Sequence, residues 1–232
     1  MTQTGDGDRA LPRSPLELLE ALAREEVVVA PDLRHLEIYT MRGLLTILWH
    51  GPIDAERVVV TGGGAMGGLL GPAGGLYHDL GAQFAADGIG TMRVGYRKPN
   101  DLVRCVHDLA AAADLASRAG GRRFVTVGHS FGGAVAIQAG MVLGAHCAGV
   151  VTLATQSAGC EDAGALRDDV PVLLLHGDRD SILPPDSSFM VRMLIGHGDV
   201  EILPGTDHLM TEAADHLRER LGTWIPEVLD RD

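Results

Sequence analysis

Short apolar runs alternate along most of the chain with longer segments whose apolar positions recur at helical spacing. Short runs rich in β-branched and aliphatic residues predict strands at 57–61, 89–94, 124–127, 148–154, 170–175 and 200–203. Longer segments between them predict helices at 77–86, 101–119, 131–143, 187–195 and 211–224. Repeated strand–helix alternation is typical of a doubly wound α/β domain. We therefore expect a mostly parallel sheet of about eight strands with helices on both faces.

The N-terminal part of the chain has a different pattern. Residues 33–40 and 44–50 flank a short turn and predict an antiparallel hairpin at the edge of the sheet. Leucines at positions 16, 18, 19 and 22 predict a short amphipathic helix over 16–26. Residues 1–15, which contain several Gly, Asp and Pro, predict a flexible tail. Residues 16–232 then form a single domain, since no internal linker or repeat interrupts them.

Composition and charge exclude several classes of protein. A hydrophobic content of 46% with 22% charged residues excludes a disordered chain. The net charge of −12 gives an acidic surface that repels nucleic acid and anionic lipid, so neither is an expected partner. Three cysteines without C-x-x-C spacing make a disulfide scaffold or a zinc site poor interpretations. The polar first 13 residues lack the apolar core of a signal peptide, and no apolar stretch is long enough to span a membrane, so we expect a cytoplasmic protein.

One serine lies where a predicted strand passes directly into a predicted helix. Residues 128–132 read Gly-His-Ser-Phe-Gly and fit G-x-S-x-G, a sharp turn that projects Ser130 from the end of a strand. The glycines permit a strained backbone at the serine, and the following helix N-terminus favours developing negative charge. The alternative is a glycine-rich turn whose serine merely caps the helix.

A serine nucleophile needs a base, and the base needs an acid that orients it. Both residue types follow later predicted strands. The strand at 170–175 ends in a loop that contains Asp178 and Asp180, and the strand at 200–203 ends in a loop that contains His208. Because these loops follow parallel strands, their side chains are expected at the same sheet edge as Ser130.

The three loops together resemble those of the α/β-hydrolase superfamily. They read Gly-His-Ser-x-Gly-Gly at 128–133, His-Gly-x-x-Asp-x-x-x-Pro at 176–184 and Gly-x-x-His at 205–208. Within the superfamily the chain is most similar, over about residues 45–225, to small carboxylesterases without a lid, such as the dienelactone-hydrolase group. The resemblance implies Ser130 as nucleophile, Asp180 as acid and His208 as base. Asp178 is then expected to hold the turn through its own backbone.

A glycine-rich stretch follows the strand at 57–61 and allows two interpretations. An acyl-transfer site needs backbone N–H donors for the tetrahedral oxygen, and we expect them from Phe131 and from Gly63 or Gly64. Residues 62–67 also match the dinucleotide pattern G-x-G-x-x-G, which would indicate a nicotinamide-dependent oxidoreductase. Against that alternative, no acid follows the strand at 89–94, although Arg97 would suit a 2′-phosphate. We expect no cofactor and no metal.

The remaining loops bear on the substrate. The connection over 155–169 is too short for a lid domain, so we expect an open cavity. Residues 69–78 are either a movable cover or an ordinary surface loop. The candidate walls of the pocket are Met66, Phe131, Gln156 and Leu183. The candidate cations that would bind a substrate carboxylate are Arg97 and Arg179.

The resulting hypothesis is a carboxylesterase-like serine hydrolase that acts on a small or medium uncharged ester, thioester or lactone. A thioesterase or acyltransferase with the same three residues is one alternative. A ligand-binding protein that keeps the fold without turnover is another. The oligomeric state stays open, with a homodimer among the options.

Overall fold

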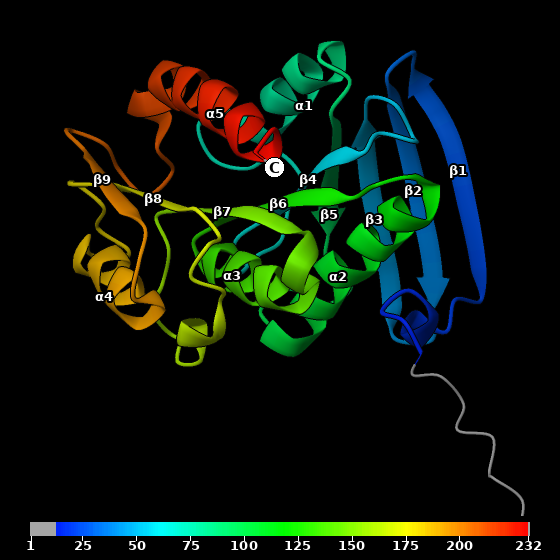
Figure 1. The fold of residues 1–232 in the computed structure, drawn as a ribbon, viewed down its shortest axis with the longest axis horizontal. Helices are drawn as coiled ribbons and strands as arrows, with labels where there is room; N and C mark the ends of the chain where they lie inside the picture. The colour runs from blue at the N-terminus through cyan, green and yellow to red at the C-terminus, as the bar shows by residue number, and fades with distance from the viewer. Residues whose placement is uncertain (1–12, 232) are drawn as a thin grey trace, which may run out of the picture.

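The computed structural model describes residues 13–231, which form nine strands of one sheet with helices packed on both faces (Figure 1). The spatial order of the strands is β1-β2-β3-β5-β4-β6-β7-β8-β9. β1, β2 and β3 pair antiparallel, and β3 also runs antiparallel to β5, whereas all pairs from β5 to β9 are parallel. The predicted α/β class with a mostly parallel sheet is therefore confirmed.

The strands and helices follow the predicted ranges closely from residue 33 onward. The strands are β1 (Ala23–Ala30), β2 (Leu33–Thr40), β3 (Gly43–His50), β4 (Arg57–Gly62), β5 (Gly90–Gly95), β6 (Arg123–His129), β7 (Cys147–Leu153), β8 (Val172–Gly177) and β9 (Asp199–Leu203). The α-helices are α1 (Leu76–Ala86), α2 (Leu102–Ala119), α3 (Phe131–Leu143), α4 (Asp186–Ile195) and α5 (Ala214–Leu229). Short 3-10 turns lie at Glu17–Leu19, Gly144–His146, Ala163–Ala165 and Thr211–Ala213.

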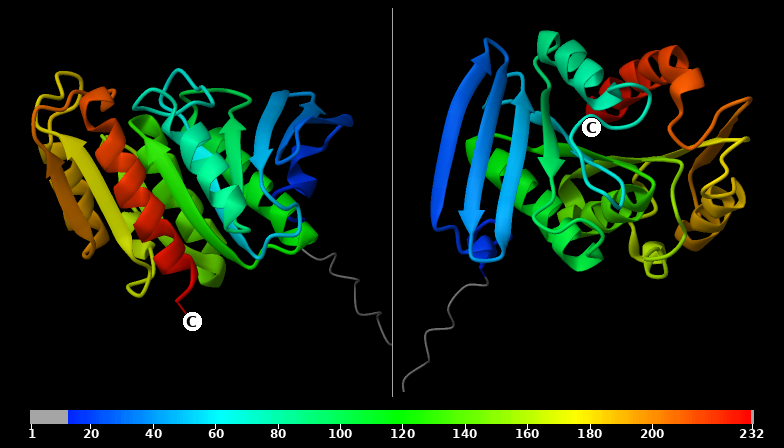
Figure 2. Two further views of the ribbon diagram at one scale, coloured as in Figure 1. Left: turned by 90° about the horizontal axis from the view of Figure 1, so that it is seen from above. Right: turned by 180° about the vertical axis from the view of Figure 1, so that it is seen from behind.

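The helices form two layers around the sheet. α1 and α5 lie side by side on one face, and α2, α3 and α4 cover the other, as both turned views confirm (Figure 2). Every residue of β7 and β8 is buried, because both strands have neighbours on either side and helices cover both faces of the sheet. The connection between β7 and β8 contains one 3-10 turn, in agreement with the predicted lack of a lid domain.

The prediction of a helix over 16–26 is wrong. Only Glu17–Leu19 form a 3-10 turn, which ends at Glu20 in a left-handed conformation, φ 51°. The chain then forms β1, a strand that the sequence did not predict and that brings the total in the sheet to nine. Its Ala23 pairs with Tyr39 of β2. The leucine pattern spans too few residues for a stable helix. The β-branched residues Val27 and Val28 instead pair with His35 and Arg34 of β2.

Two further details concern the ends of the domain. Residues 1–12 of the predicted tail lie outside the described residues, whereas Arg13 contacts Glu20 and the Pro15 carbonyl accepts a hydrogen bond from His107. At the other end, α5 continues beyond the predicted stop and includes Pro226. Burial of Ile225, Val228 and Leu229 outweighs the one backbone hydrogen bond that this proline cannot donate. Among the helices described, none combines the length and the apolar character that a membrane crossing requires.

Candidate active site

Ser130 lies at a strained turn between β6 and α3. Its φ of 57° with ψ of −121° places a non-glycine residue in a region that side chains rarely adopt. The flanking glycines explain how the turn fits. A Cβ on Gly128 would lie 1.8 Å from the Gly132 carbonyl oxygen, and one on Gly133 would lie 2.2 Å from Thr155 Oγ1. The turn is therefore compatible with glycine alone at both positions.

Asp180 and His208 meet as the sequence predicted, although they are 28 residues apart. His208 Nδ1 lies 2.6 Å from Asp180 Oδ2. The other carboxylate oxygen accepts hydrogen bonds from the backbone N–H groups of Ile182 and Leu183, both at 2.8 Å. Burial by itself would raise the pKa of Asp180, but the hydrogen bonds from Leu183, His208 and Ile182 together lower it. The carboxyl is thus held as a carboxylate that orients the imidazole.

His176 adds a second histidine to the same carboxylate. Its Nε2 lies 3.0 Å from the Leu183 carbonyl oxygen and 3.2 Å from Asp180 Oδ2, so Nε2 carries the proton. Its Nδ1 lies 2.7 Å from Ser188 Oγ, which donates to it from α4. The sequence marked His176 only as part of a turn motif. The structure shows that its Nε2 donates to the Leu183 carbonyl and lies beside the buried Asp180 carboxylate.

The two other carboxylates of these loops have structural contacts. Asp178 accepts a hydrogen bond from the Gly205 N–H at 2.7 Å, so it ties the β8 loop to the β9 loop rather than bonding its own backbone as predicted. Asp207 accepts from the backbone N–H groups of Leu209 and Met210, at 2.9 and 3.0 Å. It shapes the turn around His208 without facing it.

Ser130 and His208 line one cavity of about 500 Å³. Its lining consists of the glycine-rich loop, the elbow and the His208 loop: Gly63, Gly64, Ala65, Met66, Gly67, Gly68, Leu69, Leu70, Gly71, Pro72, His129, Ser130, His208 and Leu209. Within residues 13–231, no hydrogen bond joins Ser130 Oγ to the His208 ring, although both residues line the cavity. Such contacts are commonly long without substrate and tighten when it binds.

Of the predicted pocket walls, Met66 lines this cavity, whereas Gln156 and Leu183 do not. Phe131, predicted both as a wall and as a backbone donor, is 4% exposed, and its ring packs edge-on against Tyr96 at 6.4 Å. Its N–H lies at the first residue of α3, where helix N–H groups have no partner within the helix. The ring is therefore part of the core, and the backbone N–H is the polar group that Phe131 presents at the start of α3.

Two buried tyrosines orient the glycine loop, and no sequence motif marked either of them. Tyr77 donates to the Gly62 carbonyl at 3.0 Å, and Tyr96 donates to the Gly63 carbonyl at 3.2 Å. Burial raises the pKa of both phenols, so they stay protonated donors. In a trans peptide the next N–H points opposite to the carbonyl. The N–H groups of Gly63 and Gly64 are therefore turned away from the tyrosines, and both residues line the cavity.

The same loop fits a dinucleotide poorly. A pyrophosphate-binding loop leads directly into a helix whose N-terminus binds the phosphates. Here α1 begins only at Leu76, well after Gly67. Within residues 13–231, moreover, no three His, Cys, Asp or Glu side chains gather as metal ligands would.

Residues 69–78, predicted as a movable cover or a surface loop, are anchored. The Ala73 N–H donates to the Leu209 carbonyl at 2.7 Å, and the Tyr77 N–H donates to the Leu70 carbonyl at 3.0 Å. The two arginines that the sequence offered for a substrate carboxylate lie elsewhere. Arg97 forms a buried ion pair with Asp108 at 2.5 Å, and Arg179 is exposed and outside the cavity lining.

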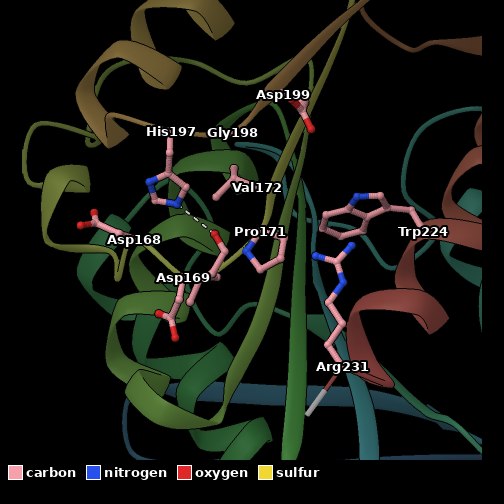
Figure 3. Close-up of a pocket in the computed structure, with 10 residues that line it drawn as sticks. Asp168, Asp169, Pro171, Val172, His197, Gly198, Asp199, Trp224 and Arg231 are labelled. Atoms are coloured by element: carbon pink, nitrogen blue, oxygen red, sulfur yellow. Dashed lines mark hydrogen bonds between the residues drawn. The ribbon is translucent and has the colours of Figure 1, made fainter.

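A second cavity, of about 300 Å³, lies near the start of β8 (Figure 3). Asp168, Asp169 and His197 line it, and His197 Nε2 donates to the Val170 carbonyl at 2.9 Å. Ligands of parallel sheets bind at the carboxyl ends of the strands, whereas this cavity lies at the amino end of β8. The cavity that contains Ser130 is therefore the candidate active site.

Comparison with solved structures identifies the fold as that of the α/β hydrolases. Est1E from Butyrivibrio proteoclasticus matches 85% of this chain and 99% of its own length, with a TM-score of 0.69 and 14% identity. A putative α/β hydrolase from Agrobacterium tumefaciens gives 84% and 96% coverage, a TM-score of 0.71 and 17% identity. A dienelactone hydrolase from Anabaena variabilis gives 88% coverage of this chain and 98% of its own, with a TM-score of 0.68 and 16% identity. No protein-family model and no curated protein sequence matches the chain.

Proposed function

We propose that the protein is a serine hydrolase that cleaves small or medium uncharged esters through an acyl-enzyme on Ser130. The observation that carries this proposal is the 2.6 Å contact between His208 Nδ1 and a buried Asp180 carboxylate, at a cavity that also exposes Ser130. An oriented imidazole beside a free serine on a strained elbow is what nucleophilic acyl transfer requires. The fold shared with an esterase and a dienelactone hydrolase supports the same chemistry.

In the proposed reaction His208 Nε2 takes the Ser130 hydroxyl proton while Oγ attacks the ester carbonyl. The Phe131 N–H and an N–H of Gly63 or Gly64 stabilise the oxyanion. The carbonyl re-forms, the alcohol leaves with the proton from His208, and an acyl-serine remains. A water molecule gives a proton to His208 and attacks the acyl group, and collapse returns the proton to Ser130 as the acid leaves. Asp180 stabilises the charged imidazole in both halves of the cycle.

The preference for an uncharged substrate follows from the cavity lining. No Lys or Arg side chain is among the described residues that line it, and the only ionisable side chains there are His129 and His208. The net charge of −12 also repels anionic substrates. A substrate carboxylate would thus lose its hydration without gaining a cationic partner, which is unfavourable.

Labelling with a fluorophosphonate probe tests the proposal. We expect the wild type and a Ser181→Ala control, which changes an exposed serine of the Asp180 loop, to be labelled. Ser130→Ala and His208→Ala should remain unlabelled while still unfolding cooperatively, which shows that they are folded. No label on a folded wild type would reject the hydrolase and favour the ligand-binding alternative.

A panel of acyl donors and acceptors then separates the activities that share this machinery. Neutral phenyl esters, matched esters with a terminal carboxylate, and thioesters are compared by kcat/KM. Faster turnover of the carboxylate esters would contradict the argument from the lining. Transfer of the acyl group to an added alcohol in preference to water would identify an acyltransferase.

A further inference from the structure

His129 precedes the candidate nucleophile and contacts the backbone of the His208 loop, whereas Asp180 contacts the His208 ring. Its Nε2 lies 2.8 Å from the His208 carbonyl oxygen, and the two imidazole rings are 4.9 Å apart. A carbonyl oxygen can only accept, so Nε2 must carry the ring proton. The side chain comes from β6 and is 8% exposed, so this contact joins the elbow directly to the loop that carries His208.

The other ring nitrogen of His129 is available as an acceptor, and His129 is one of the residues that line the cavity. Burial lowers the pKa of His129 to about 4, an effect that the hydrogen bond to His208 only partly offsets, so the ring is neutral at pH 7. With the proton on Nε2, Nδ1 keeps its lone pair, and no donor among the described residues reaches it. An ideal Cβ on Gly64 would lie 3.7 Å from Nδ1, which places this nitrogen beside the glycine loop.

We propose that His129 has two roles: its Nε2–H positions His208, and its Nδ1 selects esters that carry a hydroxyl or N–H donor next to the scissile carbonyl. This inference rests on the proposed hydrolase function and specifies its substrate class. Apart from the proposed nucleophile Ser130 and base His208, the side chains in the cavity lining are apolar or absent, since they come from Gly, Ala, Met, Leu and Pro. A substrate donor over Gly64 therefore finds its side-chain acceptor in His129. An apolar group there would leave Nδ1 unpaired on desolvation.

Matched substrates test the selective role in the unmodified protein. A 2-hydroxyacyl phenyl ester is compared with the ester in which hydrogen replaces the hydroxyl. A single hydrogen bond predicts about a 2- to 10-fold higher kcat/KM for the hydroxy ester. Equal values, or a preference for the plain ester, would overturn the selective role.

Two variants of His129 separate the roles, because each amide reproduces one ring nitrogen. In His129→Asn the side-chain oxygen can occupy the Nδ1 position, so we expect the hydroxy preference to persist while kcat falls about 10- to 100-fold as His208 loses its support. In His129→Gln the amide nitrogen can reach the His208 carbonyl. We expect that variant to retain more kcat than His129→Asn and to lose the preference. If both variants show the same kcat and the same ratio of kcat/KM between the hydroxy ester and the plain ester, the division of roles is refuted.

A third variant avoids any change to His129 itself. Gly64→Ala places a methyl group 3.7 Å from Nδ1, an ordinary contact distance, and should hide this acceptor from the substrate. The ratio of kcat/KM between the hydroxy ester and the plain ester should then fall toward 1. An undiminished ratio would contradict the role of Nδ1 as acceptor. Fluorophosphonate labelling accompanies every assay. A labelled wild type without any hydroxy preference refutes this inference alone, whereas an unlabelled wild type refutes the hydrolase proposal on which it rests.

Discussion

Adding a single methyl group at Gly132 tests how closely the elbow packs against the glycine loop. An ideal Cβ at this position would lie 2.4 Å from the Gly63 carbonyl oxygen and 2.7 Å from that of Gly62. Both atoms belong to the backbone, and the hydroxyls of Tyr96 and Tyr77 hold them in place. No flexible side chain can therefore move aside to make room for the methyl group.

The size of the effect follows from these distances. Ordinary contact begins at 3.4 Å, so the elbow and the loop must separate by about 1 Å in Gly132→Ala. Overpacking of this kind costs about 1–3 kcal/mol of unfolding free energy. For a chain of this length, that corresponds to a melting temperature lower by roughly 2–12 °C. A displacement of about 1 Å at an active site also costs about 100-fold in rate.

Differential scanning calorimetry and the fluorophosphonate labelling rate measure the two effects. Gly64→Ala is the matched control for stability, because its Cβ would meet its nearest neighbours at 3.7 Å and the backbone there needs no left-handed conformation. We expect the control to melt within about 1 °C of the wild type. A Gly132→Ala protein that melts and reacts like the wild type would show that the elbow and loop are not packed as described.

Other predictions concern three further groups of residues. Asp180→Asn should lower kcat by about 10³- to 10⁴-fold, because the amide cannot hold the imidazole in its required tautomer, and an unchanged kcat would contradict the role of the acid. Folding lowers the pKa of Asp180, so its carboxylate stabilises the fold above its unfolded pKa of about 3.9 and loses this effect as pH falls through the folded value. The difference in melting temperature between wild type and Asp180→Asn should therefore shrink in acid; a constant difference would count against the shift. Asp108→Ala leaves the buried Arg97 unpaired and should cost about 3–5 kcal/mol in urea unfolding, whereas a loss below about 1 kcal/mol would mean that water reaches the pair. Burial raises the pKa of the thiols of Cys105, Cys147 and Cys160 to about 12. A thiol reagent at pH 8 should therefore label them only after unfolding, and labelling of the native protein would contradict their burial.

The sequence predicted the parallel part of the fold well because buried strands and amphipathic helices have distinct hydrophobic periods. It failed at β1, where charged residues precede Val27–Val29 and both faces of the strand are exposed, so that no alternation marks it. It also ended the last helix too early, because Pro226 is a local signal whereas the burial of Leu229 depends on tertiary packing.

In the candidate site, too, the sequence predicted some residues and missed others. Short motifs pointed to Ser130, Asp180 and His208, and the structure places the last two within hydrogen-bond distance. The residues that hold this arrangement carried no such signal. Tyr77 and Tyr96 act through hydroxyl contacts to backbone carbonyls of a loop distant in sequence. Contacts of this kind arise from the fold, and residue type and local spacing do not encode them.

The loop that carries His208 is fastened from several directions at once. Asp178 holds it through Gly205, Asp180 holds the imidazole, and Leu209 accepts the Ala73 N–H. Two of these contacts come from the loop after β8 and the third from residues 69–78, so neither segment can detach without breaking a bond to the His208 loop. Amide exchange at Gly205 and Ala73 should then report one shared opening free energy. A shared value would show that the site opens as a single cooperative unit.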